Sequence, residues 1–345
     1  MKNNLEQLVR KNIWNLAPYS SARDEYEGKE GVFLDANENP FGTYNRYPDP
    51  QQAELKKQLA SLKNVFPNQI FLGNGSDEVI DLAFRIFCEP NKDKALTFTP
   101  TYGMYEVSAN INAVEVIKLP LNAVFQIDRK SLEPYFSDPN LKLIFICSPN
   151  NPSGNLIQSE DIEFILENFN GIVIIDEAYI DFCPEATFAA KLNQYPNLII
   201  SQTLSKAWGL AGIRLGIAFM SDALLQFFNK VKPPYNISSA NQKIALEALL
   251  NTTEFELNVK QILFEKAKMI QELQMIKLVK NIYPSDANFL LVEVENANAV
   301  YAELVQQKII IRNRNTVVAN CVRITIGTAE ENKKLVNALK TMSNG

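Results

Sequence analysis

Residues 201–214 of the chain read SQTLSKAWGLAGIR, and the stretch lies between two apolar runs. The runs, residues 198–200 and 215–220, are typical of buried strands, so the stretch is predicted to connect two strands of a core sheet. Lys206 would lose part of its hydration there, which lowers the pKa of its amine and makes the amine a better nucleophile. Most lysines between strands are ordinary surface residues. Its neighbouring residues therefore determine whether Lys206 is predicted to be a functional residue.

The polar neighbours of Lys206 have the chemistry of an anion site. Thr203 and Ser205 offer short hydroxyl donors, and Arg214 offers a guanidinium fork. Together these groups suit a phosphate dianion. A reactive amine beside such a phosphate cradle indicates a pyridoxal phosphate site.

A second stretch, residues 73–78 (GNGSDE), could complete this cradle. It follows an apolar run and precedes a helical pattern, so Gly75, Ser76 and Asp77 would direct free helix amides toward an anion. A Gly-x-Gly before a helix is also a common tight turn. The stretch therefore supports the phosphate site only together with Arg214 and Ser205.

Composition limits the class of protein. The chain has 345 residues, 46% of them hydrophobic and 21% charged, with a net charge of −5. These values are typical of a globular protein and give no reason to expect binding to nucleic acid. No apolar run approaches the ~20 residues of a membrane span, and residues 1–6 are polar, so we expect no membrane segment and no signal peptide. Four widely spaced cysteines favour reduced thiols and a cytoplasmic location.

The chain contains no histidine. This excludes hydrolases with a Ser-His-Asp triad, zinc sites built on histidine and any histidine general base. Acid-base chemistry must then use Lys, Tyr, Asp, Glu or Cys, which strengthens the case for Lys206. Asp176 and Glu177 are adjacent acids, but without further ligands they are a poor metal site, and we expect no metal.

Apolar runs that end in polar residues predict an α/β fold with a mostly parallel, doubly wound sheet. The run 172–175 ends at Asp176, the run 143–147 leads into residues 148–154, and the run 95–98 leads to Tyr102. The carboxyl ends of parallel strands form the binding crevice of such sheets. Tyr102 could therefore stack on a ligand, although simple structural burial explains it as well.

The end of the chain has a different pattern. Helical periodicity covers residues 238–250 and about 253–278. The pattern β-α-β-β-α then follows in residues 289–294, 297–307, 309–311, 321–326 and the last residues. This pattern predicts a second, smaller α+β domain. We expect a large domain over residues 46–250.

The motifs occur in an order that resembles the fold-type I pyridoxal-phosphate aminotransferases. They are Asn-Pro-x-Gly at 151–154, Asp-x-x-Tyr at 176–179 and Ser-Lys-x-x-Gly-x-x-Gly-x-Arg at 205–214. The finer resemblance is to the histidinol-phosphate aminotransferases, and it rests on DANENP at 35–40, RYP at 46–48, TYGMY at 101–105, SPNNP at 148–152 and VRITIG at 322–327. It spans nearly the whole chain. It implies a small domain built from both termini, here residues 1–45 and 251–345.

The resemblance implies a role for each residue at the cofactor. Lys206 would bind pyridoxal phosphate covalently and shuttle a proton, and Asp176 would pair with the ring nitrogen. Asn151 and Tyr179 would bond the phenolic oxygen of the ring, and Tyr102 would stack on its face. The phosphate would contact Gly75, Ser76, Asp77, Thr203, Ser205 and Arg214.

The resemblance also implies the partners. The counterpart of Tyr47 reaches the phosphate from the other subunit, which implies a homodimer with composite sites. Arg323 would bind the anionic end of the substrate, with Tyr19 and Asn37 as further substrate-binding residues. The substrates would be histidinol phosphate, glutamate and 2-oxoglutarate.

Three alternatives stay open from the sequence. Close relatives with most of these motifs include aromatic amino acid aminotransferases and enzymes similar to threonine-phosphate decarboxylase, in which carbon dioxide leaves the substrate. A non-enzymatic regulator that keeps the fold is disfavoured, because Lys206, Asp176, Asn151, Tyr179 and Arg323 are all present together.

Overall fold

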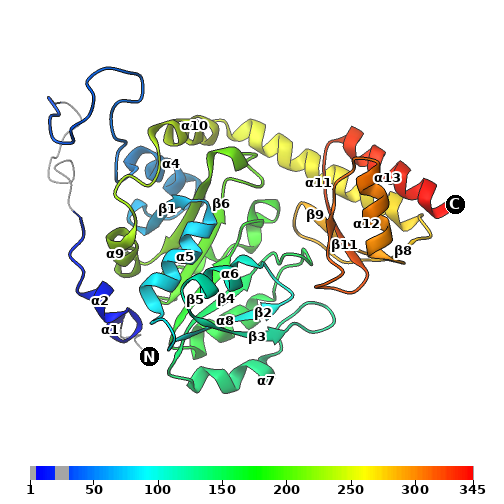
Figure 1. The fold of residues 1–345 in the computed structure, drawn as a ribbon, viewed down its shortest axis with the longest axis horizontal. Coiled ribbons are helices and arrows are strands. Elements are labelled where there is room, and N and C mark those ends of the chain that lie inside the picture. The colour runs from blue at the N-terminus through cyan, green and yellow to red at the C-terminus, as the bar shows by residue number, and fades with distance from the viewer. Residues whose placement is uncertain (1–4, 20–30, 345) are drawn as a thin grey trace.

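The computed structural model describes residues 5–19 and 31–344. In this part of the chain a seven-stranded sheet forms the centre of the large domain, with strand order β1-β7-β6-β5-β4-β2-β3 (Figure 1). Neighbouring strands run parallel, except that β7 is antiparallel to both β1 and β6. The predicted α/β fold with a mostly parallel sheet is confirmed. The strands are Ile70–Asn74 (β1), Lys94–Thr99 (β2), Glu115–Pro120 (β3), Leu141–Cys147 (β4), Ile172–Asp176 (β5), Leu198–Thr203 (β6) and Leu215–Met220 (β7).

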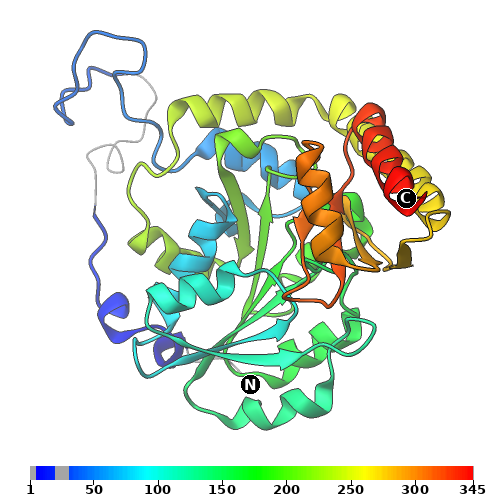
Figure 2. The same cartoon turned by 45° about the vertical axis from the view of Figure 1, so that its right-hand side comes forward.

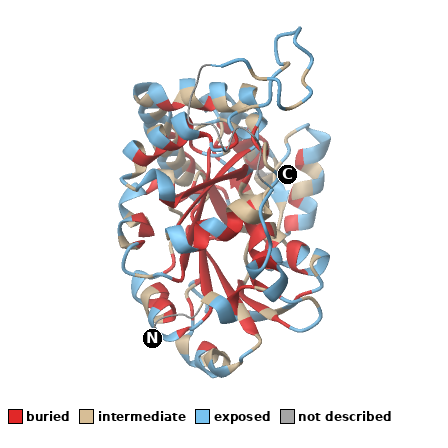
Figure 3. Cartoon of the chain, turned by 90° about the vertical axis from the view of Figure 1, so that its left-hand side faces the viewer, coloured by how far each residue is buried: buried red, intermediate tan, exposed pale blue. Residues whose placement is uncertain are grey.

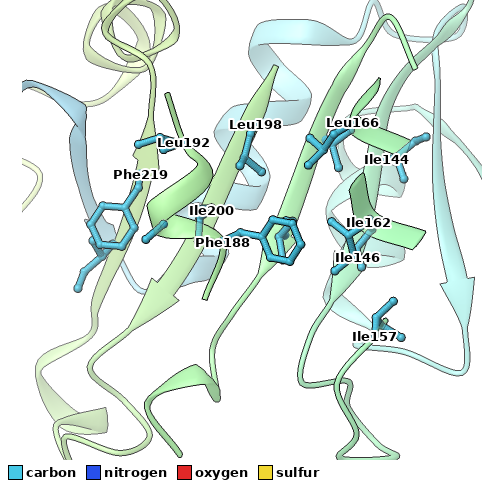
Figure 4. Packing of buried hydrophobic residues seen from close by; sticks show 14 of the residues in the cluster. Ile144, Ile146, Ile157, Ile162, Leu166, Phe188, Leu192, Leu198, Ile200 and Phe219 are labelled. Carbon is cyan, nitrogen blue, oxygen red and sulfur yellow. The ribbon is translucent and has the colours of Figure 1, made fainter. Parts of the chain in front are cut away.

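The strands are apolar on both faces because each face carries its own core. In β4, Ile144 and Ile146 belong to one core, whereas Leu143 and Phe145 belong to the other. Figure 4 shows the first core around Ile144, Ile146 and Phe188. It is covered by α4 (Ala53–Lys63), α8 (Ser159–Asn168) and α10 (Ser239–Leu250), and the second by α5 (Ser76–Phe87), α6 (Met104–Ile111) and α9 (Asp222–Val231).

Burial follows this layering. The central strands are buried along their length, and the helices expose their outer sides (Figure 3). A short helix, α7 (Arg129–Leu132), lies between β3 and β4 in the chain. Within the described ranges no helix has both the length and the apolar character needed to cross a bilayer.

A long helix, α11 (Thr252–Gln274), leads to the small domain (Figure 2). There a four-stranded antiparallel sheet has the order β10-β11-β9-β8. Its core is formed with α11, α12 (Ala297–Gln306) and α13 (Ala329–Asn344). The strands are Val279–Ile282 (β8), Phe289–Val294 (β9), Arg312–Asn313 (β10) and Cys321–Thr325 (β11).

The N-terminal helices pack on the large domain. Helices α1 (Leu5–Leu8) and α2 (Lys11–Trp14) bury Leu8, Val9 and Ile13 in the core beneath α5 and α9. Their apolar sides fill the edge of that core, so residues 5–14 do not join the small domain as the grouping of residues 1–45 with 251–345 predicted. The boundary near residue 250 stays our proposal.

Candidate active site

A pocket opens at the edge of the large sheet where the parallel strands end. Strands β1, β2, β4, β5 and β6 direct their carboxyl ends to it, and the antiparallel β7 begins there. Its lining includes all of the residues predicted at the cofactor except Tyr47. The lining residues are Gly75, Ser76, Asp77, Tyr102, Cys147, Asn151, Asp176, Ala178, Tyr179, Thr203, Ser205, Lys206 and Arg214.

One side of the pocket is an anion cradle. Helix α5 begins at Ser76, and the first amides of a helix lack carbonyl partners within it. Gly75 has φ +80°, and a Cβ there would lie 2.6 Å from Arg214 Nη2. Only glycine therefore lets the backbone and this guanidinium approach so closely. The hydroxyls of Thr203 and Ser205 lie 3.0 Å apart beside them.

The loop between β6 and β7 is held at both ends. The amide of Leu204 donates to the carbonyl of Leu215, and the amide of Leu210 donates to the carbonyl of Leu204. Trp208 stacks on Phe255 of α11 with ring centroids 3.9 Å apart. Lys206 thus sits in a loop fixed to both domains.

Asp176 forms the floor of the pocket. Its side chain is buried, and burial raises its pKa to about 6 against the opposing effect of two hydrogen bonds. The Tyr105 hydroxyl donates to Oδ2 at 2.7 Å, and the amide of Ala178 donates to Oδ1 at 3.1 Å.

Lys206 lies across the pocket. Its amine is 5.5 Å from the centre of the Tyr179 ring. The side chain is exposed at the open mouth of the site, yet its pKa is lowered, first by partial burial and then by the guanidinium of Arg323. Asp176 acts in the opposite direction. The lowered pKa favours the neutral, nucleophilic amine.

Asn151 connects the pocket to the small domain. Its Nδ2 donates to the Tyr179 hydroxyl at 3.3 Å. Its Oδ1 accepts from Arg323 Nη1 at 2.5 Å and from Arg314 Nη2 at 3.5 Å. Among the described residues, the buried Nε atoms of both arginines have no hydrogen-bond partner. Two guanidiniums on one neutral oxygen leave positive charge at this edge of the pocket, as a site for an anion requires.

Three predicted residues lie outside the pocket of this chain. Tyr47 is half-exposed and stacks on Tyr235 with ring centroids 4.4 Å apart. Tyr19 is exposed, and so is Asn37. All three belong to the N-terminal segment, whose residues 31–47 extend from the large domain as an arm (Figure 1).

The structure adds two residues to the predicted site, Tyr105 and Cys147, and it brings Arg314 to the edge of the pocket. Tyr105 stands on the first turn of α6, just after Tyr102, and Cys147 ends the apolar strand before Asn151, so spacing could have pointed to both. Arg314 precedes the strand of Arg323 with no comparable pattern.

Comparison with known proteins shows that the chain is similar to aminotransferases. The sequence pattern of aminotransferase class I and II matches residues 25–339. The chain is 51% identical to a histidinol-phosphate aminotransferase of Christiangramia forsetii, over 99% of both chains. It is 52% identical to one of Parabacteroides distasonis, over 98% of this chain and 99% of the relative.

Solved structures show the same likeness. The histidinol-phosphate aminotransferase of Clostridium acetobutylicum superposes with a TM-score of 0.81 at 28% identity, covering 87% of this chain and 91% of that one. The enzyme of Sinorhizobium meliloti, solved in complex with pyridoxal-5'-phosphate, has a TM-score of 0.77 at 22% identity, covering 87% and 83%. The second likeness concerns the fold alone.

Proposed function

The chain belongs to the histidinol-phosphate aminotransferases of aminotransferase class I and II, and we propose that the pocket at the sheet edge performs the transamination of that family. The reaction exchanges an amino group between histidinol phosphate and 2-oxoglutarate and serves histidine biosynthesis. One observation carries the assignment of the site: an amine, a buried carboxylate and an anion cradle line a single pocket. The curated relatives favour this substrate over those of the aromatic aminotransferases and the decarboxylases.

The residues of the pocket fit pyridoxal phosphate. The space that a side chain at Gly75 would fill, next to Arg214, suits a phosphate held by the amides of Ser76 and Asp77. Thr203 and Ser205 would add hydroxyl donors. When bound, the cofactor would supply a carbonyl group, whose oxygen is exchanged for the substrate's amino group, and a ring that accepts electrons.

The remaining residues would orient the ring and move the proton. Asp176, ionised above its pKa of about 6, would hold a proton on the ring nitrogen. Asn151 and Tyr179, already hydrogen-bonded to each other, would hold the phenolic oxygen. Tyr102 would cover one face of the ring. The neutral Nζ of Lys206 would take the proton from the substrate carbon that carries the amino group and would deliver it to the cofactor carbon that receives this group.

Arg323 and Arg314 would receive the anionic end of both substrates. Histidinol phosphate carries a phosphate and no α-carboxylate, whereas glutamate carries two carboxylates and no phosphate. A guanidinium fork binds either anion. The two arginines meet at Asn151, so a bound anion would lie beside the reacting groups.

Arg323→Ala is expected to weaken both half-reactions by ~2–4 kcal/mol in kcat/KM, because a charged contact is lost at a desolvated site. Arg323→Lys should restore only part of this, since the fork is lost. Single-turnover spectroscopy with each substrate measures the two halves separately. Arg85→Ala is the control, because Arg85 is exposed on α5 and forms its ion pair with Asp81 of the same helix. A loss confined to glutamate would make Arg323 a carboxylate clamp and leave the phosphate to Arg314 or Tyr19.

We also propose that two copies of the chain form composite sites. The arm exposes large apolar side chains that a solvated segment does not need: Val32, Leu34, Phe41 and Tyr44 are 74–89% exposed. Such a cluster suits a protein interface. Tyr47 lies at the end of this arm and would reach the phosphate of the other copy.

Mixing two inactive variants tests this arrangement. In a hybrid of Tyr47→Phe and Lys206→Ala subunits, one site inherits both defects and the other neither. Activity is therefore expected to return on mixing, toward a quarter of the wild-type value per site when exchange is complete, by the statistics of random pairing (about half the dimers being hybrids). No recovery, with exchange verified by mass-labelled subunits, would place Tyr47 in its own subunit's site.

We place the enzyme in the cytoplasm as part of the same proposal. The cysteines Cys88, Cys147, Cys183 and Cys321 are all free and buried, as suits a reducing compartment.

A coupled assay for glutamate formed from histidinol phosphate and 2-oxoglutarate tests the function. Release of carbon dioxide, or a preference for aromatic amino acids, would overturn it.

A further inference from the structure

Tyr105 is held rigidly beside the floor of the pocket. It lies on α6, is 1% exposed and stacks on Phe145 of β4 with ring centroids 4.9 Å apart at 18°. Tyr102 meets it edge-on at 5.7 Å. With both its face and its edge packed, the ring can present its hydroxyl in only one direction.

That direction is toward Asp176. The hydroxyl donates to Oδ2 at 2.7 Å, while the Ala178 amide holds Oδ1 at 3.1 Å. Neither donor is a cation, so the carboxylate keeps its full negative charge for a ligand. The two bonds fix the carboxylate plane, because each oxygen has a separate donor, one on α6 and one in the turn after β5.

We propose that Tyr105 is a positioning residue, which holds the Asp176 carboxylate in the orientation and ionised state that a cofactor ring nitrogen requires. This rests on the proposed function, in which Asp176 faces that nitrogen. Tyr105 acts only through Asp176 and does not line the pocket itself. Its role differs from that of Tyr102, which precedes α6 and lines the pocket.

A tyrosine suits this role because it does not titrate near neutrality. Burial and the nearby Asp176 raise the pKa of Tyr105 well above its usual range, so the hydroxyl stays a donor. The other groups facing Asp176 include Cys147 from β4, Asp77 from α5, Tyr102, Lys206 and Tyr179. The pKa of Cys147 and that of Tyr179 are also raised by burial, so neither the thiol nor this phenol carries charge near neutrality.

The sign of the pH effect follows from the hydrogen bond. Donation to Oδ2 favours the ionised carboxyl and lowers its pKa, although burial still keeps that pKa at about 6. Removing the hydroxyl would raise the pKa further. As the pH falls, a ligand that needs ionised Asp176 loses affinity. In the variant this loss would begin at a higher pH than in the wild type.

The test is binding of pyridoxal phosphate to apo-protein, followed by fluorescence quenching across a pH series. Tyr105→Phe keeps the stacked ring and removes one hydroxyl. It is expected to weaken binding about tenfold near neutrality and to move the acidic midpoint up by about one pH unit, as for losing a hydrogen bond to a charged group. Tyr195→Phe is the matched control, because that hydroxyl contacts Glu167 on the surface.

A double-mutant cycle separates positioning from packing. In an Asp176→Asn background, Tyr105→Phe should change cofactor affinity less than threefold or so, because the carboxylate on which it acts is gone. The same tenfold loss in both backgrounds, or a loss independent of pH, would overturn the proposal. If wild-type protein failed to bind the cofactor, or Asp176→Asn had no effect, the proposed function itself would fail instead.

Discussion

Lys206→Ala is expected to fold, to bind pyridoxal phosphate and to turn over at least ~10³-fold more slowly than the wild type. The phosphate cradle of Ser76, Thr203 and Arg214 stays intact, so affinity survives in part. The site then lacks its movable proton carrier. Asp176 lies on the pocket floor with both oxygens already hydrogen-bonded, which leaves it unsuited to replace the amine.

Borohydride treatment followed by peptide mapping gives the direct measurement. In the wild type, the cofactor should be fixed on the peptide that contains Lys206, and Lys206→Ala should give no labelled peptide. Lys266→Met is a matched control, because the pKa of Lys266 is also lowered by burial but its amine donates to the carbonyls of Ser285 and Ala287. Labelling at any lysine other than Lys206 would refute the assignment.

Asp176→Asn is expected to keep the fold and to lower kcat by about 10²–10³-fold or more, because a neutral amide cannot hold a proton on the ring nitrogen. The Tyr105 hydroxyl still finds an acceptor in the asparagine oxygen. Steady-state rates with cofactor-saturated protein measure the loss. Near-native turnover of this variant would refute the proposal that Asp176 pairs with the ring nitrogen.

The same variant has a pH signature in the apo-protein. The pKa of Asp176 is raised from 3.8 to about 6, so the native state binds more protons than the unfolded chain between these values. Ionisation of Asp176 therefore lowers the free energy of unfolding as the pH rises through this window, and the cost persists above it. The free energy of unfolding of Asp176→Asn, relative to that of the wild type, should therefore rise by on the order of 3 kcal/mol between pH ~3.5 and pH ~7. Denaturant unfolding at both pH values tests this, and an equal difference at both would contradict it.

The large domain was predictable because its strands are continuous apolar runs with polar stops. The run 172–175 ends at Asp176 in both the prediction and the structure. Strand β8, Val279–Ile282, was missed because it is a short edge strand with no buried residue and with lysine and asparagine at its centre. The strand after β9 was predicted at 309–311, whereas the observed strand β10, which pairs with β11, begins at Arg312. Edge pairing is set by the neighbour strand rather than by local sequence.

The site was predictable where its residues lie in one motif or at one strand end. Lys206, Asp176 and Asn151 are of this kind. Tyr105 was not singled out, because its contact with the site depends on packing between α6 and β4. The contact of Arg314 with Asn151 depends on the approach of the small domain. Tyr47, Tyr19 and Asn37 do not line the pocket of their own chain, and in the composite site that we propose Tyr47 would reach the pocket of a second copy.

The central claim is that one site transfers an amino group from histidinol phosphate to 2-oxoglutarate. The direct measurement is the visible absorbance of cofactor-loaded protein mixed with histidinol phosphate alone, followed by 2-oxoglutarate. We expect the absorbance band of the bound cofactor to be lost in the first step and restored in the second, with one glutamate formed per site. An unchanged spectrum with histidinol phosphate, beside a full response to glutamate, would contradict the assigned substrate.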